Sequence, residues 1–444
     1  MAITVGMVSL GCAKNRVDGE MMMATLKNEG FCLVNDAALA DVAIVNTCGF
    51  IDDAKQESID EILELAKLKQ EGQIRAIVVT GCMAERYREE IRKELPEADA
   101  VIGIGANTEI ADIIRQTLGG QNPESFPPKN RLPLYGERVH STPSYYSYIK
   151  VAEGCDSRCA YCAIPMIRGR YRSRPMESIV EEAKGLAADG TKELILIAQD
   201  TSRYGEDLYG RLMLPALLDQ LCEIDGLRWI RLLYCYPDYI TDELLDTMAR
   251  QKKVVKYIDL PLQHVSGRML KSMYRGGDRQ SITALLHKIR GRVPGITLRT
   301  TLITGFPGET EEQFIELCEF VKATEFDRLG CFAYSEEEGT PAAKLEQMPN
   351  ELRESRAEQV MEIQAKVMAK KQAEKLGQTQ RVICDGMDEE TGLYLCRSAA
   401  DAPEIDAVTY VRSDAVPIAE GEFLTVKIID SDVFDLYAER VEEN

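Results

Sequence analysis

Three closely spaced cysteines form the clearest chemical motif in the sequence. Cys155, Cys159 and Cys162 have the spacing C-x3-C-x2-C and come directly after a predicted strand. Structural zinc sites usually have four protein ligands, and no fourth ligand is near this motif. A 4Fe–4S cluster also usually takes four thiolates, so three would leave one iron with an open coordination site. Such an iron can bind a small molecule and deliver an electron to it; a zinc loop or a chance spacing is the alternative.

A second set of three cysteines is dispersed along the N-terminal part of the chain. Cys12, Cys48 and Cys82 each follow a predicted apolar strand. The carboxyl ends of parallel strands share one sheet edge, and neighbouring strands lie about 4.8 Å apart, so the three thiols could converge on one cluster. Glycines beside the cysteines permit tight turns and close backbone approach. They are Gly11, Gly49 and Gly81. Buried strand-end thiols without a ligand are the alternative.

The total cysteine content favours metal or redox chemistry over a disulfide framework. The chain has 13 cysteines, an odd number, and its N-terminus does not have the pattern of a secretory signal peptide. The cysteines outside the two sets show no ligand spacing, so we interpret them as small buried hydrophobic residues. They are Cys32, Cys222, Cys235, Cys318, Cys331, Cys384 and Cys396.

Composition and charge restrict the class of protein. The chain has 444 residues, which suggests about three domains. Lys and Arg total 53 against 73 Asp and Glu, a net charge of −20. This balance argues against a protein that binds duplex nucleic acid through a basic face. No apolar run is long enough to span a membrane. We therefore predict a cytoplasmic enzyme, or one with a basic macromolecular partner.

Strands and helices alternate through residues 1–120, which predicts a Rossmann-like parallel sheet. The predicted strands are Ile3–Leu10, Val42–Asn46, Ile74–Thr80 and Ala100–Ile104. The predicted helices are Val17–Glu29, Asp53–Lys69, Ala84–Lys93 and Ile110–Leu118. Residues 121–145 contain five prolines and no sustained period. This segment is either an inter-domain linker or a structured surface excursion.

Residues 146–377 show a second alternation, which predicts a full or partial parallel barrel with chemistry at the C-terminal strand ends. Its strands are Ser147–Ala152, Glu193–Ala198, Trp229–Tyr234, Tyr257–Leu260, Thr297–Ile303 and Arg328–Ala333. The charged amphipathic helix Asn350–Leu376 should pack along the barrel. Residues 378–444 carry short apolar runs separated by Gly, Asp and Pro, which predicts a small antiparallel β-barrel. These runs are Arg381–Cys384, Leu393–Arg397 and Phe423–Ile429.

The presence of both cysteine sets gives the chain a resemblance to the methylthiotransferase family of radical S-adenosylmethionine (SAM) enzymes. The resemblance covers nearly the whole chain. The closing β-barrel resembles a TRAM domain. The matching segments around the cysteines are Gly11-Cys-Ala-Lys-Asn-Arg-Val-Asp18, Asn46-Thr-Cys-Gly-Phe50 and Thr80-Gly-Cys-Met83. The matching barrel segments are Ala198-Gln-Asp200, Arg231-Leu-Leu, Pro261-Leu-Gln-His264 and Thr304-Gly-Phe-Pro-Gly-Glu309.

Within this family the sequence is similar to the RimO-type branch, which modifies an aspartate of small-subunit ribosomal protein 12. Gln263-His264-Val-Ser266 and Tyr334-Ser-Glu-Glu-Glu-Gly-Thr340 resemble this branch more than the branch that modifies adenosine in transfer RNA. Ala13 departs from the proline common at that position. Residues 378–444 contain five basic and sixteen acidic residues, a net charge of −11. So acidic a domain suits a basic ribosomal protein better than a phosphate backbone, although an ordinary solvated acidic surface has the same count.

The resemblance implies two 4Fe–4S clusters and two SAM molecules per turnover. One SAM would methylate a sulfur held at the Cys12, Cys48 and Cys82 cluster. The other would be cleaved at the Cys155, Cys159 and Cys162 cluster, and the radical would remove a hydrogen atom from the aspartate β-carbon, which then takes the methylthio group. A radical is needed because this hydrogen is too weakly acidic for a side-chain base, and the protein supplies position and excludes competing reactions. Reductant and sulfur-donor proteins are implied as further partners.

The resemblance also indicates residues that would hold SAM at the barrel mouth. Tyr161 matches the position that packs near the adenine, and Gln199 and Asp200 match a motif near the amino group. Arg231 and Arg299 are candidates to bind the carboxylate by charge-assisted bonds. Polar contacts that stabilise the barrel are an equal alternative for these residues. Two further candidates are a glycine turn containing Gly305, which would approach the adenine, and the acidic run Glu336–Glu338, which would contact a basic substrate or simply be solvated.

His264 is more simply a hydrogen-bonded supporting residue than a proton relay. Three other functions remain open: a transfer RNA methylthiotransferase, a two-cluster electron-transfer or scaffold protein, and a zinc-binding interaction protein. The first predicts a basic face, the second needs no SAM site, and the third would contain zinc without iron.

Overall fold

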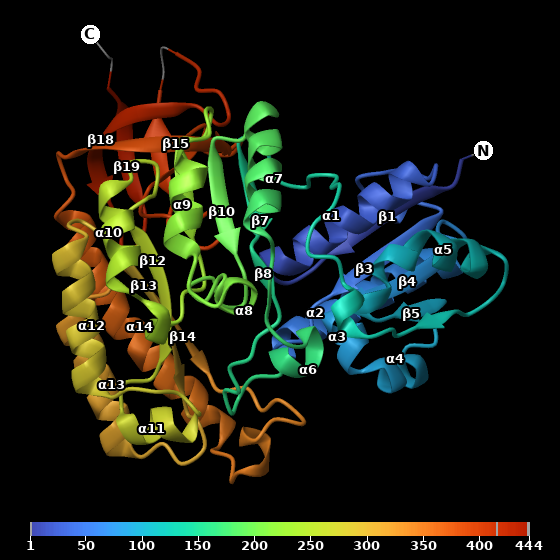
Figure 1. Ribbon diagram of the computed structural model, residues 1–444, viewed down its shortest axis with the longest axis horizontal. Coiled ribbons are helices and arrows are strands. Elements are labelled where there is room, and N and C mark those ends of the chain that lie inside the picture. Colours follow the sequence, from blue (N-terminus) through green and yellow to red (C-terminus); the bar gives the residue numbers. More distant parts are fainter. Residues whose placement is uncertain (1, 414–415, 442–444) are drawn as a thin grey trace.

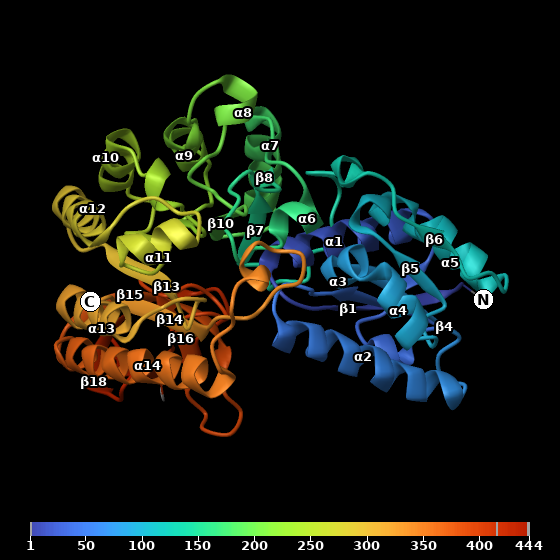
Figure 2. The same cartoon turned by 90° about the horizontal axis from the view of Figure 1, so that it is seen from below.

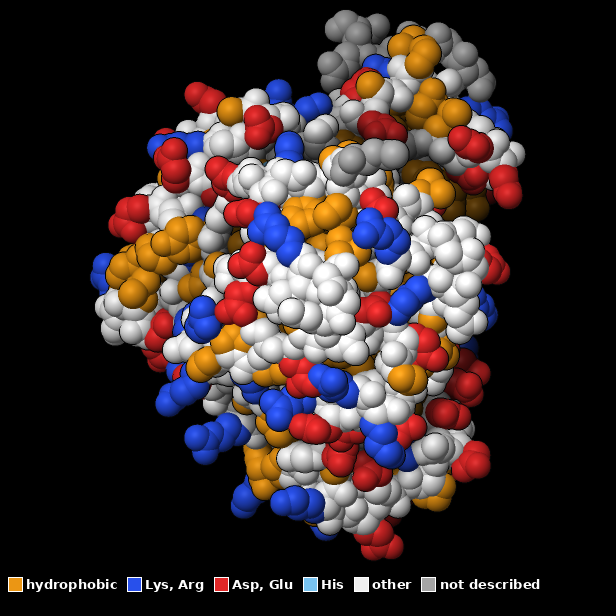
Figure 3. Space-filling model, turned by 90° about the vertical axis from the view of Figure 1, so that its right-hand side faces the viewer, with side chains coloured by type: hydrophobic (Ala, Val, Ile, Leu, Met, Phe, Trp, Pro, Cys, Tyr) orange, Lys and Arg blue, Asp and Glu red, His pale blue; other side chains and the backbone are white. Residues whose placement is uncertain are grey.

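The computed structural model describes residues 2–413 and 416–441 and arranges them in three packed units (Figure 1). An N-terminal α/β unit lies beside an incomplete parallel barrel, and a small closed β-barrel covers one end of the latter. None of the helices within the described residues combines the length and apolar character needed to cross a bilayer. Figure 3 shows the side formed by the N-terminal unit, where acidic and basic side chains are interspersed with small hydrophobic patches.

The N-terminal unit is a six-stranded, all-parallel sheet, as predicted. Its strand order is β2-β1-β3-β4-β5-β6, so the order reverses between β1 and β3. Every residue of β3 and β4 is buried, because helices cover both faces of the sheet. The strands are β1 Thr4–Ser9, β2 Cys32–Leu33, β3 Val42–Thr47, β4 Ala76–Gly81, β5 Ala100–Ile102 and β6 Glu124–Ser125. The helices are α1 Ala13–Asn28, α2 Asp52–Gln70, α3 Cys82–Arg86, α4 Arg88–Glu94 and α5 Ile110–Leu118.

Helix α1 packs between the N-terminal sheet and the first barrel strand. It therefore buries polar side chains on more than one face, including Asn15, Asp18 and Glu20. Asn15 donates to the carbonyl oxygens of Asn46 and Thr47 in its own sheet, whereas Asp18 bonds Lys150 of the barrel. The segment 121–145 has structure of its own, since β6 pairs with β5. Arg138, in the same segment, bonds Glu20 on α1 and Glu182 on the barrel side. These contacts fix the N-terminal sheet against the barrel.

The central unit is a partial barrel of six parallel strands in two three-stranded sheets, as the fold class predicted. The sheets adjoin at β11 and β12, where a single bridge joins Ile230 and Val254. The barrel strands are β7 Tyr146–Lys150, β10 Glu193–Ile197, β11 Trp229–Leu232, β12 Tyr257–Gln263, β13 Thr297–Thr304 and β14 Arg328–Ala333, and a short pair, β8 Ala152–Glu153 and β9 Arg172–Ser173, follows β7. The helices are α6 Ile164–Arg168, α7 Met176–Ala188, α8 Glu206–Tyr209, α9 Leu214–Cys222, α10 Asp242–Arg250, α11 Gly267–Ser272, α12 Arg279–Arg292, α13 Glu311–Thr324 and α14 Asn350–Ala373.

Two barrel helices begin at clear capping signals. Asp278 before α12 and Thr310 before α13 each accept a bond from the third helical residue, whose side chain bonds back. The outer face of the barrel buries a continuous apolar core under these helices. Helix α14 lies along β14, and the segment between them reaches across to the N-terminal unit (Figure 2).

The C-terminal unit is a closed five-stranded barrel of order β15-β16-β17-β19-β18. Its strands are β15 Thr379–Met387, β16 Tyr394–Ser398, β17 Thr409–Arg412, β18 Phe423–Ser431 and β19 Leu436–Arg440. The prediction of an antiparallel barrel is correct for four of its pairings and wrong for one, because β17 and β19 run parallel. Its buried Arg397 bonds Glu193 at the start of β10, so the small barrel is fixed beneath the N-terminal ends of the large one.

Candidate active site

The three N-terminal cysteines lie together at the carboxyl edge of the sheet. Cys12 caps α1 after β1, Cys48 follows β3, and Cys82 begins α3 after β4. These three strands are direct neighbours, and β1 and β3 flank the point where the strand order reverses, which is where ligands bind in such sheets. A Cβ atom on Gly11 would lie 2.8 Å from the Cys48 Sγ, so only glycine leaves the thiol this space. We call these residues the N-terminal cysteine set.

Charge distinguishes the three thiols of this set. Burial opposes ionisation of Cys12, but the Lys14 ammonium and the Arg168 guanidinium outweigh it and hold its pKa below the usual 9.0. Burial raises the pKa of Cys48, and it raises that of Cys82 to about 12 although Arg168 opposes the shift. Cys12 is therefore the thiol most ready to bind a metal, since the thiolate is the ligand form.

The second set occupies the loop between β8 and α6, at the C-terminal mouth of the barrel. Burial is the main cause of the raised pKa of Cys155 and of Cys162, and a neighbouring Cys159 thiolate raises both pKa values further. The Cys159 Sγ lies 3.6 Å from the Tyr236 hydroxyl and 4.0 Å from the Arg275 guanidinium. We call these residues the barrel cysteine set.

The two cysteine sets face one another across helix α6. The buried Cys82 packs against Ala163 and Ile167, which follow Cys162 directly in the chain. At the end of the same helix, Arg168 donates a hydrogen bond of 3.2 Å to the Cys82 Sγ. A helix of five residues thus joins the two sets and fixes their separation.

Arg168 is the centre of a buried ion network that joins the two units. Its guanidinium bonds Asp18 on α1, Glu153 on β8 at 3.3 Å, and the Asn15 amide oxygen at 3.1 Å. Lys150 bonds the same two carboxylates and shares their burial. Although burial opposes its charge, Lys150 and Arg168 hold the pKa of Glu153 far below its usual value. Two cations and two carboxylates are therefore paired at the interface.

The donor atoms of both sets fit iron–sulfur clusters. Within residues 2–413 and 416–441, no three Cys, His, Asp or Glu side chains lie close enough to hold one metal ion. A 4Fe–4S cluster needs a wider spacing, because each thiolate binds a different iron. Each set offers three thiols, and the cations Lys14, Arg168 and Arg275 lie beside them. Those cations would offset the negative charge of a thiolate-bound cluster.

Three buried polar atoms without hydrogen-bond partners lie beside the barrel set and could hold a ligand. They belong to three side chains at the ends of β10 and β12: the Gln199 Oε1, the Asp200 Oδ2 and the Gln263 Oε1. Such atoms are costly unless a ligand or water satisfies them. All three are acceptors, so they suit the ammonium group of an amino acid, which SAM carries. Burial raises the pKa of Asp200 to about 6, and a bound cation would reverse this shift.

We expect Asp200→Asn to stabilise the ligand-free protein at pH 8 and to leave its stability nearly unchanged near pH 4. The folded pKa of Asp200 lies above its ordinary 3.8, so stability in the wild type falls as pH rises from 3.8 through about 6. The substitution removes this loss, which is about 3 kcal/mol. Thermal unfolding across this pH range measures it, with Asp225→Asn at an exposed position as the control. An equal gain in stability at every pH would contradict the assignment of a raised pKa to Asp200.

Tyr161 and Gly305 lie at the barrel mouth as expected, with different surroundings. Tyr161 packs against an apolar cluster that includes Phe306 and Tyr334, and its hydroxyl accepts a bond of 3.3 Å from Arg275. Gly305 has a φ of +69°, and a Cβ there would lie 2.3 Å from the Arg353 Cγ. Its close approach is therefore to α14, not to open space.

Arg231 and Arg299 bond the protein's own carboxylates. The fully buried Arg231 donates to Glu193 at 2.7 Å and to the Ala399 carbonyl oxygen at 2.9 Å, which leaves one terminal nitrogen without a partner. Arg299 bonds Asp259 at 2.8 Å and approaches Asp406 of the C-terminal unit. Ala399 and Asp406 both belong to the C-terminal unit, so both arginine side chains point to the end of the barrel that this unit covers. We therefore leave both out of the SAM site proposed below.

His264 is a supporting residue. Its Nδ1 accepts backbone bonds from Val265 and Ser266 at 2.9 and 3.0 Å, so its Nε2 carries the proton and donates to Glu309 at 3.0 Å. The ring is fully buried and has no free position for proton transfer.

Several site residues carry no strong sequence signal. Lys14 lies 3.4 Å above the Tyr234 ring, and Arg168 bonds the Cys82 Sγ. Each is close in sequence to a motif cysteine, which is the only hint of its role. Tyr234 and Gln263 adopt positive φ at the ends of β11 and β12, a conformation that marks strained functional positions. Arg275 follows α11 and has no motif context.

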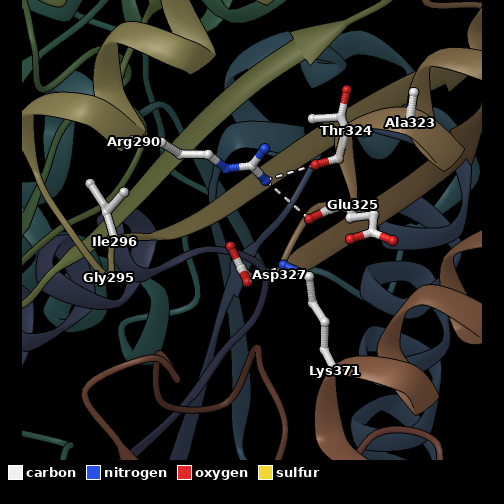
Figure 4. Close-up of a pocket in the computed structure, with 8 residues that line it drawn as sticks. All are labelled: Arg290, Gly295, Ile296, Ala323, Thr324, Glu325, Asp327 and Lys371. Carbon is white, nitrogen blue, oxygen red and sulfur yellow. Dashed lines mark hydrogen bonds and ion pairs between the residues drawn. The ribbon is translucent and has the colours of Figure 1, made fainter. Parts of the chain in front are cut away.

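A pocket at the opposite end of the barrel does not belong to this site. Its volume is about 410 Å³, and it lies where β13 and β14 begin (Figure 4). Arg290 crosses it and donates to the carbonyl oxygens of Thr324 and Glu325 at 2.7 and 3.1 Å. Parallel barrels carry their chemistry at the other end of the strands, where both cysteine sets lie.

Comparison with family models gives three matches along the chain. Residues 4–103 match an uncharacterized protein family, UPF0004, residues 149–321 match the radical SAM superfamily, and residues 376–441 match a TRAM domain. The structure of the radical SAM methyltransferase TsrM from Kitasatospora setae shares the fold with a TM-score of 0.55 and 16% identity, covering 77% of this chain and 75% of that one. The barrel and its cysteine loop thus define a radical SAM enzyme.

Curated relatives identify the family within this superfamily. Ribosomal protein uS12 methylthiotransferase RimO of Lachnoclostridium phytofermentans is 47% identical over 97% of this chain and 98% of the relative. The protein of the same name from Caldanaerobacter subterraneus is 48% identical over 98% and 99% of the two chains. The chain belongs to the RimO family of methylthiotransferases.

Proposed function

We propose that the protein transfers a methylthio group to the β-carbon of an aspartate in ribosomal protein uS12. The observation that carries the proposal is the pair of cysteine sets, which face one another across a helix of five residues. Transfer of a sulfur group to an unactivated carbon needs a radical source and a sulfur source held close together. Relatives named for this reaction match nearly the whole chain.

Each cysteine set would hold one 4Fe–4S cluster. When bound, the clusters and SAM would supply reductive cleavage of SAM at the barrel set and a methylated sulfur at the N-terminal set. Gln199 and Asp200 would hold the SAM amino group, and Tyr161 would pack near its adenine. Arg168 and its ion network would hold the two sites at a fixed distance and exclude water between them.

The acidic C-terminal barrel favours a protein substrate over transfer RNA. Of its five basic residues, Arg397 is buried against Glu193, and Arg440 bonds Glu422 at 3.0 Å. Few cations therefore remain to contact phosphates. A ribosomal protein as substrate, with reductant and sulfur-donor proteins as further partners, places the enzyme in the cytoplasm.

A competition assay tests this function. Anaerobically reconstituted enzyme receives SAM, reductant, uS12 and bulk transfer RNA together, and mass spectrometry follows both substrates. We expect the mass gain of a methylthio group on an aspartate-containing peptide of uS12. The same gain on transfer RNA alone would reject the substrate and keep the chemistry. Formation of deoxyadenosine with neither product would reject both substrates.

A further inference from the structure

A groove crosses the N-terminal unit between helices α2 and α4. Its volume is about 780 Å³, and its floor is apolar, formed by Ile59, Leu63, Met83 and Tyr87 among others. Leu63 keeps 38% of its surface exposed in the groove. An open apolar floor of this kind is a feature of binding surfaces.

The rim of the groove is acidic. It carries Asp52, Glu90 and Glu94 from the N-terminal unit and Glu336 and Glu338 from the segment after β14. Its single cation, Lys55, already bonds Asp52 at 2.6 Å and lies 3.5 Å from Glu337. In the described part of the chain, Glu90, Glu336 and Glu338 are exposed and form no ion pair. The groove thus has uncompensated negative charge above an apolar floor.

The groove begins beside the cysteine sets. Met83 on its floor follows Cys82 directly, and the segment that carries Glu336 and Glu338 leaves the mouth end of β14. Arg86 holds that segment on the N-terminal unit, since it bonds the Glu337 carboxylate and donates to the Glu338 carbonyl oxygen at 2.8 Å. The groove therefore lies directly beside the N-terminal cysteine set.

We propose that this groove docks a basic segment of the protein substrate and leads its target residue to the active site. The inference rests on the proposed function. Lys and Arg side chains suit the groove because their stems cover apolar surface while their charges meet the acidic rim. A protein whose normal partner is ribosomal RNA carries such segments.

Binding of purified uS12 to the full-length, cluster-loaded enzyme tests the proposal. We expect the double variant Glu336→Lys/Glu338→Lys and the single variant Leu63→Asp each to weaken binding about tenfold or more. The charge variant should also lose most of the salt dependence of the wild type. Titration calorimetry at two salt concentrations measures both effects.

Matched controls carry the same changes away from the groove. Glu358→Lys/Glu362→Lys alters net charge equally on the exposed face of α14, and Ile315→Asp places a carboxylate at an exposed apolar position of α13. Both should bind uS12 as the wild type does. Because all the substituted side chains are exposed, thermal unfolding should be nearly unchanged.

Three results would overturn the docking site. The first is wild-type affinity in both groove variants, or equal loss in the controls. The second is a loss of affinity for transfer RNA in the groove variants while their affinity for uS12 stays unchanged. The third is a change from dimer to monomer in Leu63→Asp with uS12 affinity intact, which would make the groove a contact between copies of this chain. If the wild type forms methylthio product on uS12 and the groove variants keep full affinity, only the docking site is rejected. If the wild type neither binds uS12 nor forms product, the proposed function is rejected as well.

Discussion

Replacing Cys155, Cys159 and Cys162 with alanine should abolish SAM cleavage, so that neither deoxyadenosine nor methylthio product forms. We assign the reduction of SAM to the open coordination site of this set. Replacing Cys12, Cys48 and Cys82 should instead abolish methylthio transfer while deoxyadenosine still forms. We expect at least a thousandfold loss in each case, because removing a group that acts in the chemical step has effects of this size.

Deoxyadenosine and methylthio product are both quantified from the same reaction by mass spectrometry. Cys32, Cys222 and Cys318 supply the matched control, since they lie outside both sets. The triple alanine variant at these positions should form both products. Loss of deoxyadenosine in the N-terminal variant, with the fold intact, would contradict the division of roles between the two sets.

Replacing Arg168 with methionine should have the second largest effect. The substitution leaves Asp18 and Glu153 buried with Lys150 as their only cation, and it removes the hydrogen bond to the Cys82 Sγ. Breaking a buried ion pair from one side costs about 3–5 kcal/mol. We therefore expect lower thermal stability in the cluster-free chain and loss of iron from the N-terminal set alone.

Calorimetry and iron content measure these two effects. Arg168→Lys should recover part of the stability and little of the iron, because a single ammonium cannot reach Asn15, Asp18 and Cys82 together. Arg250→Met, at an exposed pair with Asp219, should change neither quantity. Full iron content in Arg168→Met would show that the network supports the interface without organising the N-terminal set.

The sequence predicts this fold well where burial is uniform. Strands such as β3 and β4 are apolar throughout because helices cover both faces, so their pattern is unambiguous. The predicted helix Ala84–Lys93 is instead two helices that meet at Tyr87, whose φ of −123° breaks the helix. Strands β17 and β19 of the small barrel were not predicted, because they have only four and five residues and lie among turns.

The site was predicted where cysteine spacing or strand ends define it, and not where it depends on packing between units. The network of Asp18, Lys150, Glu153 and Arg168 joins four elements, and no local pattern marks charges that only a tertiary interface brings together. Arg231 shows that a sequence motif can also identify a residue without revealing where its side chain points. A motif identifies it as important, but its place within β11 turns it towards Glu193 instead of the barrel mouth.

Iron and sulfide content of three anaerobically reconstituted proteins tests the central claim most directly. The claim is that two cysteine sets hold two clusters, one on each side of helix α6. It predicts about eight irons in the wild type and about four in each triple alanine variant, with equal amounts of sulfide. About four irons in the wild type, unchanged when Cys12, Cys48 and Cys82 are replaced, would contradict it. Zinc without labile sulfide would contradict it for both sets.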